Sequence, residues 1–587
     1  MDRTGKVAVA ILIILIALCL YNQPKTPPVP PGASPSPTPA VAAAPGGQAT
    51  PPPQTVEPGT VPAPTPVPVL PEKTEELSAN KAVAFTFTNH GGGIARATLL
   101  NHITDSESKK NIVLNEYGPA PVGATSDQPV EGMDDSYTST TGTDGTITYE
   151  RTTADQIQIT KKYTLPTSVG DVNQYITTLD ITFKNLGTQN HFQKPWFIAI
   201  GATAPVHKND YGTYIGMDWD VKGSTKETGV SAFAGSHMPI IGSPEKFEIT
   251  NASPDIGWAG VHNQYFATII TPVSTPGTQV WSDRIPVDIL QHTAGVQSAV
   301  SRTPGVSSQW WAINGALGMP GFDLAPGTPH TEKFKIYLGT REYNLLKHLD
   351  GGQVGIMQTG WRGPISRVLL KALIWLHNWV GGYAVAIIVL TIILKLLLWP
   401  LQNRATQSMK KMSLLNPKMA ELREKYKDAP ERLNQEVIKL YRAYGVNPFG
   451  GCLPMFIQLP IFFGFYAMLG TAIELRNSRF FWVHDLTQPD TIGHIPFLGW
   501  PLNILPLCMA ATSAWMTFMT PKSGDPSQQR MMLFTPLIFL FICYNYASGL
   551  ALYMMVSNLF SVVQFIVTKN QVPPTLEKVI PPGKKKK

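Results

Sequence analysis

A single lysine interrupts the apolar stretch TIILKLLLWP, residues 391–400. Lys395 has three apolar residues on each side, and a further apolar run occupies residues 384–390. An ionisable side chain inside a membrane helix is unfavourable, so its presence indicates a functional site such as a substrate path. Alternatively, its stem reaches toward the cytosolic headgroups, because Trp399 follows four residues later, ~6 Å along a helix axis. The position of Lys395 alone leaves both interpretations open.

Other polar or helix-breaking residues lie in the apolar runs that follow. The stretch NPFGGCLPMFIQLPIFFGFYAML, residues 447–469, contains the helix-breaking Pro454 and Pro460, the amide of Gln458, and the pair Gly450 and Gly451, which we interpret as a hinge. Other apolar runs contain Thr391, Asn503, Asn545, Ser548, Tyr553 and Asn558. Helix–helix hydrogen bonding explains any one of these residues. Several of them together with one cation favour a hydrated cavity.

Sequence signatures of enzymes are missing from the chain. It has no GxSxG, HExxH, GxxxxGK[ST] or GxGxxG motif. The glycine-rich NHGGGIAR, residues 89–96, lies between two predicted strands and indicates a tight turn. The four cysteines all lie in apolar runs, so they predict neither a disulfide framework nor a metal knuckle. We therefore predict a non-enzyme with no catalytic residues, no metal ligands and no cofactor.

The N-terminal part of the chain predicts an anchor and a spacer. An apolar run at residues 7–21 follows Arg3 and Lys6, as in a cleaved signal peptide, a lipoprotein signal or an uncleaved anchor. No small-x-small cleavage site ends the run, and Leu18 precedes Cys19 where a lipoprotein signal has a small residue. We favour an uncleaved anchor over residues 1–23. Residues 24–76, rich in proline and alanine, predict an extended linker.

Residues 77–345 predict a large all-β domain. Segments such as AVAFTFTN, IQITKKYTL and TEKFKIYLG alternate apolar and polar residues, with Gly, Asn, Asp and Pro between them. Many short strands are typical of a β-sandwich. The pattern then changes to a helical period at residues 361–380, where one apolar face contains Ile365, Val368, Leu369, Ala372, Leu373 and Leu376. This basic, tryptophan-rich helix predicts a position in the membrane interface; the alternative is a helix packed on the β domain.

Residues 381–570 predict five membrane spans. Three of these spans cover residues 383–401, 452–472 and 497–519. Residues 531–568 would form a helix of ~57 Å, nearly twice the ~30 Å hydrocarbon core, so they predict two spans broken near residues 545–549. With the anchor, the fold class is a six-span α-helical membrane protein with a large β-sandwich domain.

The charge distribution predicts how these spans are oriented. Residues 22–360 carry a net charge of −8, whereas the rest of the chain carries +15. Residues 402–448 contain ten Lys and Arg, and the tail 571–587 ends in KKKK. Positive segments stay in the cytosol, which places both termini inside and the β domain outside. The separation of charge indicates two compartments rather than DNA binding.

The loop 402–448 predicts a cytosolic helical hairpin. Asn416-Pro417 and Asp428-Ala429-Pro430 are typical of helix starts. This hairpin could be a solvated connector without a function of its own. Alternatively, it is a docking arm for the ribosome or an arriving polypeptide. The basic residues that would form the arm are Lys410, Lys411, Lys418, Arg423, Lys425, Arg432 and Arg442.

These motifs resemble the YidC/Oxa1/Alb3 family of membrane protein insertases, in particular the YidC members of Gram-negative bacteria. The resemblance rests on TIILKLLLWPLQNRATQSMKKMSLLNPKMAELREKYKD, NPFGGCLPMFIQLPIFFGFYAML, FFWVHDLTQPD and SGLALYMMVSN, and it covers most of residues 361–570 in order. It implies a five-span insertase core and a periplasmic β-supersandwich. It also implies an inner-membrane location and, as partners, nascent membrane proteins, the Sec translocon, the ribosome and the lipid bilayer.

The resemblance also implies a site. In the family, an arginine in the first core span lies in a hydrophilic groove that is open to the cytosol and closed toward the periplasm. Lys395 stands in its place, Thr391 matches a groove-lining threonine, and Tyr553 matches the first of two tyrosines, the second being Met554 here. Lysine keeps the charge but lacks the planar fork of arginine. We expect Gln458, Asn545 and Ser548 to line the same groove.

Two other functions fit parts of the sequence. A solute or ion transporter would explain the buried charge and the broken helices, but the spans show no inverted repeat and contain no acidic residue. An envelope enzyme acting on sugars would use the β domain, but we find no convincing pair of carboxylates there, and fold does not imply function. We therefore favour an insertase.

Overall fold

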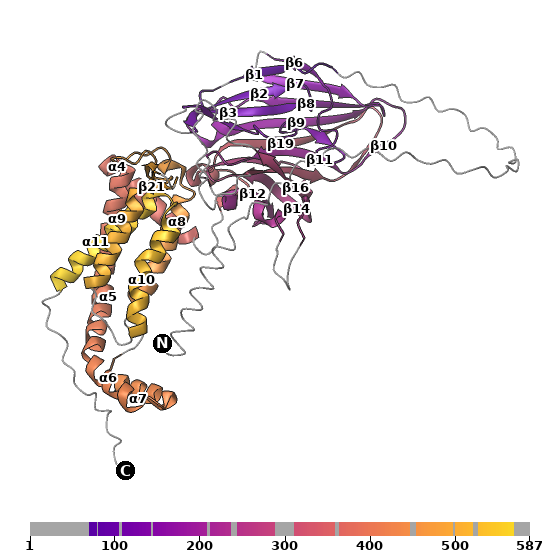
Figure 1. Ribbon diagram of the computed structural model, residues 1–587. Coiled ribbons are helices and arrows are strands. Elements are labelled where there is room, and N and C mark those ends of the chain that lie inside the picture. Colours follow the sequence, from indigo (N-terminus) through magenta and orange to yellow (C-terminus); the bar gives the residue numbers. More distant parts are fainter. Residues whose placement is uncertain are drawn as a thin grey trace, which may run out of the picture.

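The chain folds into a β-rich part followed by a helical part (Figure 1). This computed structural model describes residues 70–78, 80–104, 109–142, 145–207, 210, 212–235, 244–287, 310–357, 363–446, 453–496, 499–519 and 526–568. The predicted N-terminal anchor, most of the linker, the hinge pair Gly450 and Gly451, and the basic tail lie outside these residues.

A large antiparallel sheet dominates the β-rich part. Its strands follow the order β5-β11-β17-β16-β14-β15-β19-β9-β8-β7-β6, and β12 pairs with both β13 and β14. The strands are β5 (Thr125–Ser126), β6 (Thr138–Thr141), β7 (Thr146–Thr152), β8 (Ile157–Thr164), β9 (Ile176–Asn185), β11 (Trp196–Thr203), β12 (Gly216–Val221), β13 (Ser224–Gly229), β14 (Glu248–His262), β15 (Phe266–Pro272), β16 (Gly277–Val287), β17 (Trp310–Met319) and β19 (Pro329–Thr340).

Two smaller sheets accompany the large one. The first contains β1 (Thr74–Leu77), β2 (Val83–Thr88), β3 (Gly93–Ile103) and β4 (Asn111–Leu114), and the second pairs β10 (His191–Gln193) with β18 (Phe322–Leu324). The ring of Phe87 on β2 meets the ring of Tyr163 on β8 edge to face at 5.2 Å. One hydrophobic core therefore joins the four-stranded sheet to the large sheet.

The alternating pattern explains why these segments form strands. In β9, Thr177, Leu179, Ile181 and Phe183 are buried, while the residues between them are at least partly exposed. Side chains of a strand point alternately to opposite faces, so this period puts one face of β9 into the core. The prediction of a large β-rich domain is confirmed, and the arrangement of its sheets as a sandwich stays a prediction.

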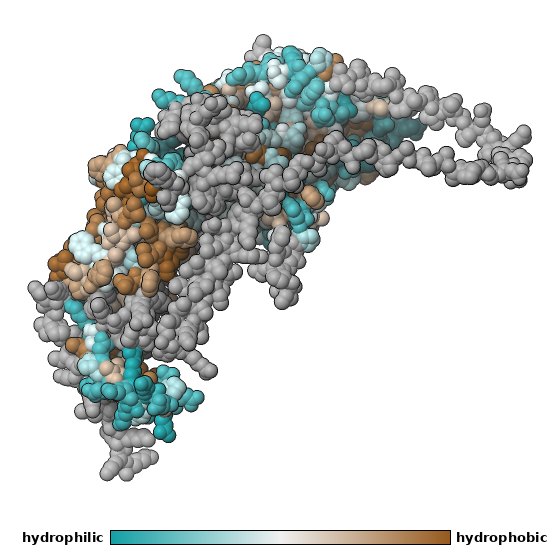
Figure 2. All heavy atoms as spheres, in the orientation of Figure 1, coloured by the Kyte–Doolittle hydropathy of each residue, from teal (hydrophilic) through white to brown (hydrophobic). Residues whose placement is uncertain are grey.

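The described residues of the helical part form eight longer helices. After the short α3 (Tyr343–Leu346) they are α4 (Gly363–Val380), α5 (Tyr383–Leu414), α6 (Asn416–Lys425), α7 (Pro430–Ala443), α8 (Leu453–Leu469), α9 (Ile504–Met519), α10 (Pro526–Cys543) and α11 (Ser548–Thr568), with the β20 (Thr491–His494) and β21 (Pro501–Asn503) hairpin before α9. Figure 2 shows apolar surface over the helices and polar surface over the β-rich part and around α6 and α7.

Two of the described helices, α5 and α11, are long and apolar enough to cross a membrane. Shorter apolar helices cover Gln458–Leu469, Ile504–Met519 and Met532–Cys543. The predicted break between the last two spans is confirmed, because α10 ends at Cys543 and α11 begins at Ser548. The total of six spans stays a prediction.

Helix α4 packs mainly on the helical part through Leu369, Leu373 and Leu376. It approaches α8 closely at Gly464, where an added Cβ would lie 2.5 Å from Ile365. The sequence placed Val368 on the same face, which is wrong: Val368 is 67% exposed. Trp375 and Trp379 are also exposed, as expected of a helix lying in a membrane interface.

The loop between α8 and α9 connects the helical part to the β-rich part through Arg476. Its guanidinium donates to the carbonyl of Ile103, at 2.6 Å, and to that of Thr104. It also lies 5.5 Å from the ring centroid of Tyr265. Burial and the nearby Arg476 charge lower the pKa of His102 to about 4, so this imidazole is neutral at neutral pH.

We predict that Arg476→Ala loosens this junction. The substitution removes two charge-assisted hydrogen bonds, each worth about 1.5–3 kcal/mol, and leaves both carbonyls without this donor. Protease cleavage at the junction should become faster in limited proteolysis, with Arg476→Lys intermediate because lysine lacks the forked geometry. The exposed Lys333→Ala, on β19, serves as the control. Equal cleavage of Arg476→Ala and the control would contradict this role.

Candidate functional site

Lys395 lies on the inward face of α5, about 18 Å along the axis from the start of the helix. Its side chain is 7% exposed, whereas the neighbouring Leu397 is 69% exposed. The lysine amine donates to Ser561 Oγ on α11 at 3.0 Å and to Gln458 Oε1 on α8 at 3.5 Å. The amine therefore lies between three helices, which favours a site over a stem that reaches the headgroups.

Gln458 connects the lysine to a second part of α11. Its carboxamide oxygen accepts from Lys395, while its nitrogen donates to the hydroxyl of Tyr553 and, at 3.4 Å, to that of Ser557. Tyr553 stacks on Phe465 of α8, with ring centroids 4.1 Å apart. This stacking fixes the phenol ring, so its hydroxyl meets the Gln458 amide.

We call Lys395, Gln458, Tyr553, Ser557 and Ser561 the Lys395 cluster. Among the described residues, the two hydrogen-bond partners of its cation are neutral. A buried cation with neutral partners keeps much of its field, because no opposite charge cancels it. The cluster can therefore attract an anionic group, and it contains hydrogen-bonding groups that can serve a polar chain.

The sequence predicted three members of the cluster and missed two. Lys395, Gln458 and Tyr553 come together as expected. Ser557 and Ser561 follow Tyr553 at intervals of four residues, so the three lie on one face of α11. The four-residue spacing could have indicated that Ser557 and Ser561 accompany Tyr553. It predicts their place in the cluster only if this face of α11 is known to contact α5 and α8.

The other predicted groove residues, Thr391, Asn545 and Ser548, form hydrogen bonds with groups outside the Lys395 cluster. Thr391 is buried one turn before Lys395, and its hydroxyl donates to Ile387 of its own helix at 2.7 Å. Ser548 donates to the carbonyl of Asp485 at 3.1 Å, and Asn545 accepts from Asn503 at 3.4 Å. Asn545 and Ser548 thus bind the α8–α9 loop and the start of α9, and the structure does not bring them to the Lys395 cluster.

Helices α6 and α7 form the predicted hairpin and begin at Asn416 and Pro430, at the predicted positions, but Asn416 and Asp428 do not cap them. The starts lack a side-chain capping hydrogen bond, and each has proline in its first turn. Lys418, Lys425, Arg432 and Arg442 are exposed, whereas Lys411 and Arg423 are partly buried. Lys418 also contacts the ring and hydroxyl of Tyr444. The hairpin therefore exposes several cations to solvent.

Lys410, one of the predicted docking residues, lies on α5 and contacts the end of α11. The sequence ended the first core span near Leu401, but α5 continues through Pro400 to Leu414. The Lys410 amine donates to the carbonyl of Thr568, the last residue of α11, at 3.0 Å. A cation at a helix C-terminus satisfies a free carbonyl and interacts favourably with the helix dipole. Lys410 thus connects α5 to α11.

We predict that Gln458→Leu destabilises the helical part by about 1–3 kcal/mol, because it removes hydrogen-bond partners of buried groups. Thermal unfolding of the detergent-solubilised protein measures this loss. Gln564→Leu on α11 is a matched control, because the buried Gln564 amide nitrogen has no hydrogen-bond partner in the described part of the chain. Equal destabilisation by the two substitutions would contradict the network.

Comparison with known proteins identifies the family. A family model described as the YidC periplasmic domain matches residues 79–372, and one described as the 60Kd inner membrane protein matches residues 375–575. The membrane protein insertase YidC of Syntrophus aciditrophicus is 32% identical over 84% of each chain. That of Maridesulfovibrio salexigens is 41% identical over 39% of this chain and 42% of the relative.

A solved structure matches as well. The crystal structure of an active YidC insertase, with its first transmembrane domain resolved, is 18% identical and covers 85% of this chain and 95% of its own, with a TM-score of 0.34. The two sequence relatives are named as insertases, not as enzymes. The chain belongs to the YidC family of inner-membrane protein insertases.

Proposed function

We propose that this chain inserts client proteins into the membrane by receiving their polar segments at the Lys395 cluster. The buried Lys395 amine supports this role, because its partners in the described part of the chain, Gln458 and Ser561, are both neutral. Substitution of an acidic client group for these partners would give the amine a stronger, charge-assisted contact. The cluster would then form part of a hydrophilic groove.

The proposed mechanism is physical and involves no change of covalent bonds. Transfer of a polar segment into hydrocarbon is opposed by the loss of its hydration. Polar side chains partway across the membrane shorten the dry path and replace some of the lost hydrogen bonds. The apolar segment of the client then leaves sideways into lipid, where its transfer from water is favourable. The exposed apolar face of α5, which includes Leu396 and Leu397, borders that exit.

The charge distribution also bears on the orientation and the partners of the chain. We infer that both termini and the α6–α7 hairpin face the cytosol and that the β-rich domain faces the periplasm, because the basic residues gather in the hairpin and the tail. The exposed cations of the hairpin suit the anionic surface of a ribosome. Nascent membrane proteins and lipoproteins are the proposed clients, and the Sec translocon is a proposed partner for some of them.

We predict that Lys395→Ala lowers insertion of clients with acidic translocated segments about tenfold, equivalent to ~1.4 kcal/mol. Clients with neutral segments should change much less, because only the electrostatic attraction is removed. Lys395→Arg should retain most activity, because it keeps the charge. Protease protection of a client in proteoliposomes that contain the purified chain measures insertion.

Lys347→Ala, at an exposed position outside the membrane helices, is the matched control for the loss of a lysine. Its insertion yield should equal that of the unchanged chain. Full insertion of acidic clients by Lys395→Ala would contradict the proposed role of the charge. Equal losses for acidic and neutral clients would show that Lys395 acts only on folding.

A further inference from the structure

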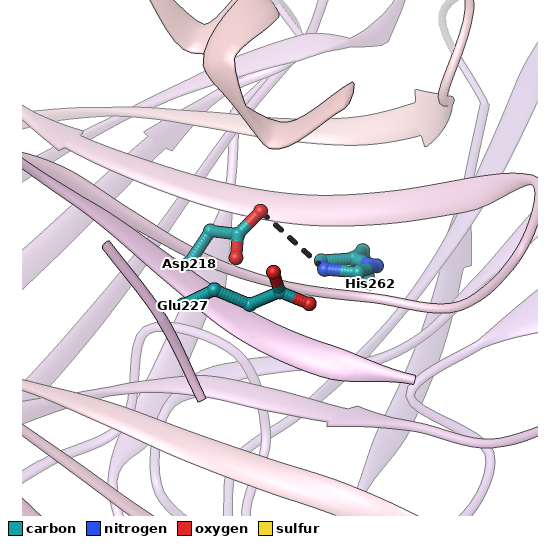
Figure 3. A group of neighbouring side chains, drawn as sticks. All are labelled: Asp218, Glu227 and His262. Atoms are coloured by element: carbon teal, nitrogen blue, oxygen red, sulfur yellow. Dashed lines mark ion pairs between the residues drawn. The ribbon is translucent and has the colours of Figure 1, made fainter. Parts of the chain in front are cut away.

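Three side chains with metal-binding atoms meet on neighbouring strands of the large sheet, far from the Lys395 cluster in sequence. Asp218 on β12 lies directly opposite Glu227 on β13, and Gly216 on β12 lies opposite His262 on β14. Because Gly216 and Asp218 are two residues apart, their side-chain positions lie on the same face of the sheet. Figure 3 shows the Asp218, Glu227 and His262 side chains pointing toward one another.

The distances between these side chains suit a common ligand. A potential ligand atom from each residue lies within 4.8 Å of the others. His262 Nε2 and Asp218 Oδ2 are 3.4 Å apart. Two ligands each ~2 Å from a tetrahedral zinc ion are ~3.4 Å apart, so this pair already has suitable spacing. Glu227 is exposed, and rotation of its side chain can bring its carboxylate closer.

Two buried atoms of the site have no hydrogen-bond partner in the described part of the chain. They are Asp218 Oδ1 and His262 Nε2, which lies 3.4 Å from Asp218 Oδ2 without forming a hydrogen bond to it, and both residues are 2% exposed. Buried polar groups are nearly always hydrogen-bonded, so two such atoms in one place call for an explanation. Two carboxylates directly opposite each other are also unfavourable. A cation between them would satisfy both atoms and remove the repulsion.

The surroundings of His262 hold its ring as in a metal ligand. Nδ1 faces the carbonyl of Asn263 at 3.3 Å, and a carbonyl only accepts, so the proton of the neutral ring belongs on Nδ1. The lone pair of Nε2 then points toward the carboxylates. A ligating histidine commonly donates its other ring nitrogen to a carbonyl in this way. Gly216 leaves room for the ring, because a Cβ there would lie 3.2 Å from Nε2.

We propose that Asp218, Glu227 and His262 bind one divalent transition-metal ion, represented here by zinc. One imidazole and two carboxylates are a ligand set that zinc accepts, with a fourth position left for water. Imidazole nitrogen disfavours magnesium and calcium, which prefer oxygen ligands. Arg341 is the nearby cation, and its guanidinium donates to the carbonyls of Asn263 and Ile356. With neutral His262, the two carboxylates and Arg341 sum to −1, which leaves attraction for a divalent ion.

The site lies beside the junction between the two parts of the chain. Tyr214, two residues before Gly216, approaches Gly470 at the end of α8, where an added Cβ would lie 2.1 Å from the Tyr214 hydroxyl oxygen. Gln264, two residues after His262, lines the same junction pocket as Tyr214 and Gly470. An ion at this site would tie β12 and β13 to β14 and stiffen the strands that carry these junction residues.

Zinc binding to the full-length protein tests the proposal. The protein is purified in detergent without a polyhistidine tag, treated with a chelator and dialysed, and then titrated with zinc by calorimetry. We expect one zinc ion per chain, a higher melting temperature with zinc, and no comparable binding of magnesium. Glu227→Gln and Asp218→Asn should each weaken zinc binding at least tenfold. Because Glu227 is exposed, the Glu227→Gln variant should fold like the unchanged chain.

Asp255→Asn provides the matched control, because Asp255 is an exposed carboxylate on β14 that pairs with Lys222. Asn tolerates its left-handed backbone, φ 61°, so this variant should fold and bind zinc like the unchanged chain. Absence of stoichiometric zinc binding by the unchanged chain would overturn the proposal. Binding by Glu227→Gln and Asp218→Asn as tight as that of Asp255→Asn would place the ion elsewhere and overturn it as well.

Discussion

The need of the buried Lys395 amine for hydrogen-bond partners constrains how the helices α5, α8 and α11 pack together. Lys395 cannot face lipid without a large loss of hydration, so α5 must present this face to α8 and α11. Gln458 and Ser561 supply the partners, and Tyr553, stacked on Phe465, supports Gln458. The packing of three helices and the polarity of their common seam thus follow from the same side chain.

The remaining elements position this seam. Lys410 lies on the C-terminal extension of α5, beyond the cluster, and donates to the last residue of α11. Helix α5 therefore connects the end of α11 to the hairpin. At the opposite end, Ser548 and Asn545 contact the loop between α8 and α9 and the start of α9, and Arg476 of that loop binds the β-rich part. Lys410, Asn545 and Ser548, which lie outside the cluster, therefore form hydrogen bonds that hold the ends of the helices in place.

Much of this organisation could be predicted from local sequence patterns. Alternation predicted the strands, apolar runs predicted the helices, and the proline positions predicted the starts of α6 and α7. Contacts between distant segments could not be predicted. Ser557 and Ser561 acquire a role only because α11 turns them toward α5 and α8, and Val368 is exposed because α4 packs through Leu370 as well. His262 reaches Asp218 through a pairing of β12 with β14 that no local pattern encodes.

If the chain acts as proposed, the polar segment of a client passes the Lys395 cluster during insertion. The most direct test places a photoreactive amino acid at Ser561, inside the cluster, or at Val567, which is 61% exposed on the same helix. Each variant is then irradiated with a ribosome-bound nascent membrane protein during insertion. We expect crosslinks from position 561 to the polar segment that precedes the client's apolar span. Efficient insertion with crosslinks to that segment only from position 567 would contradict it.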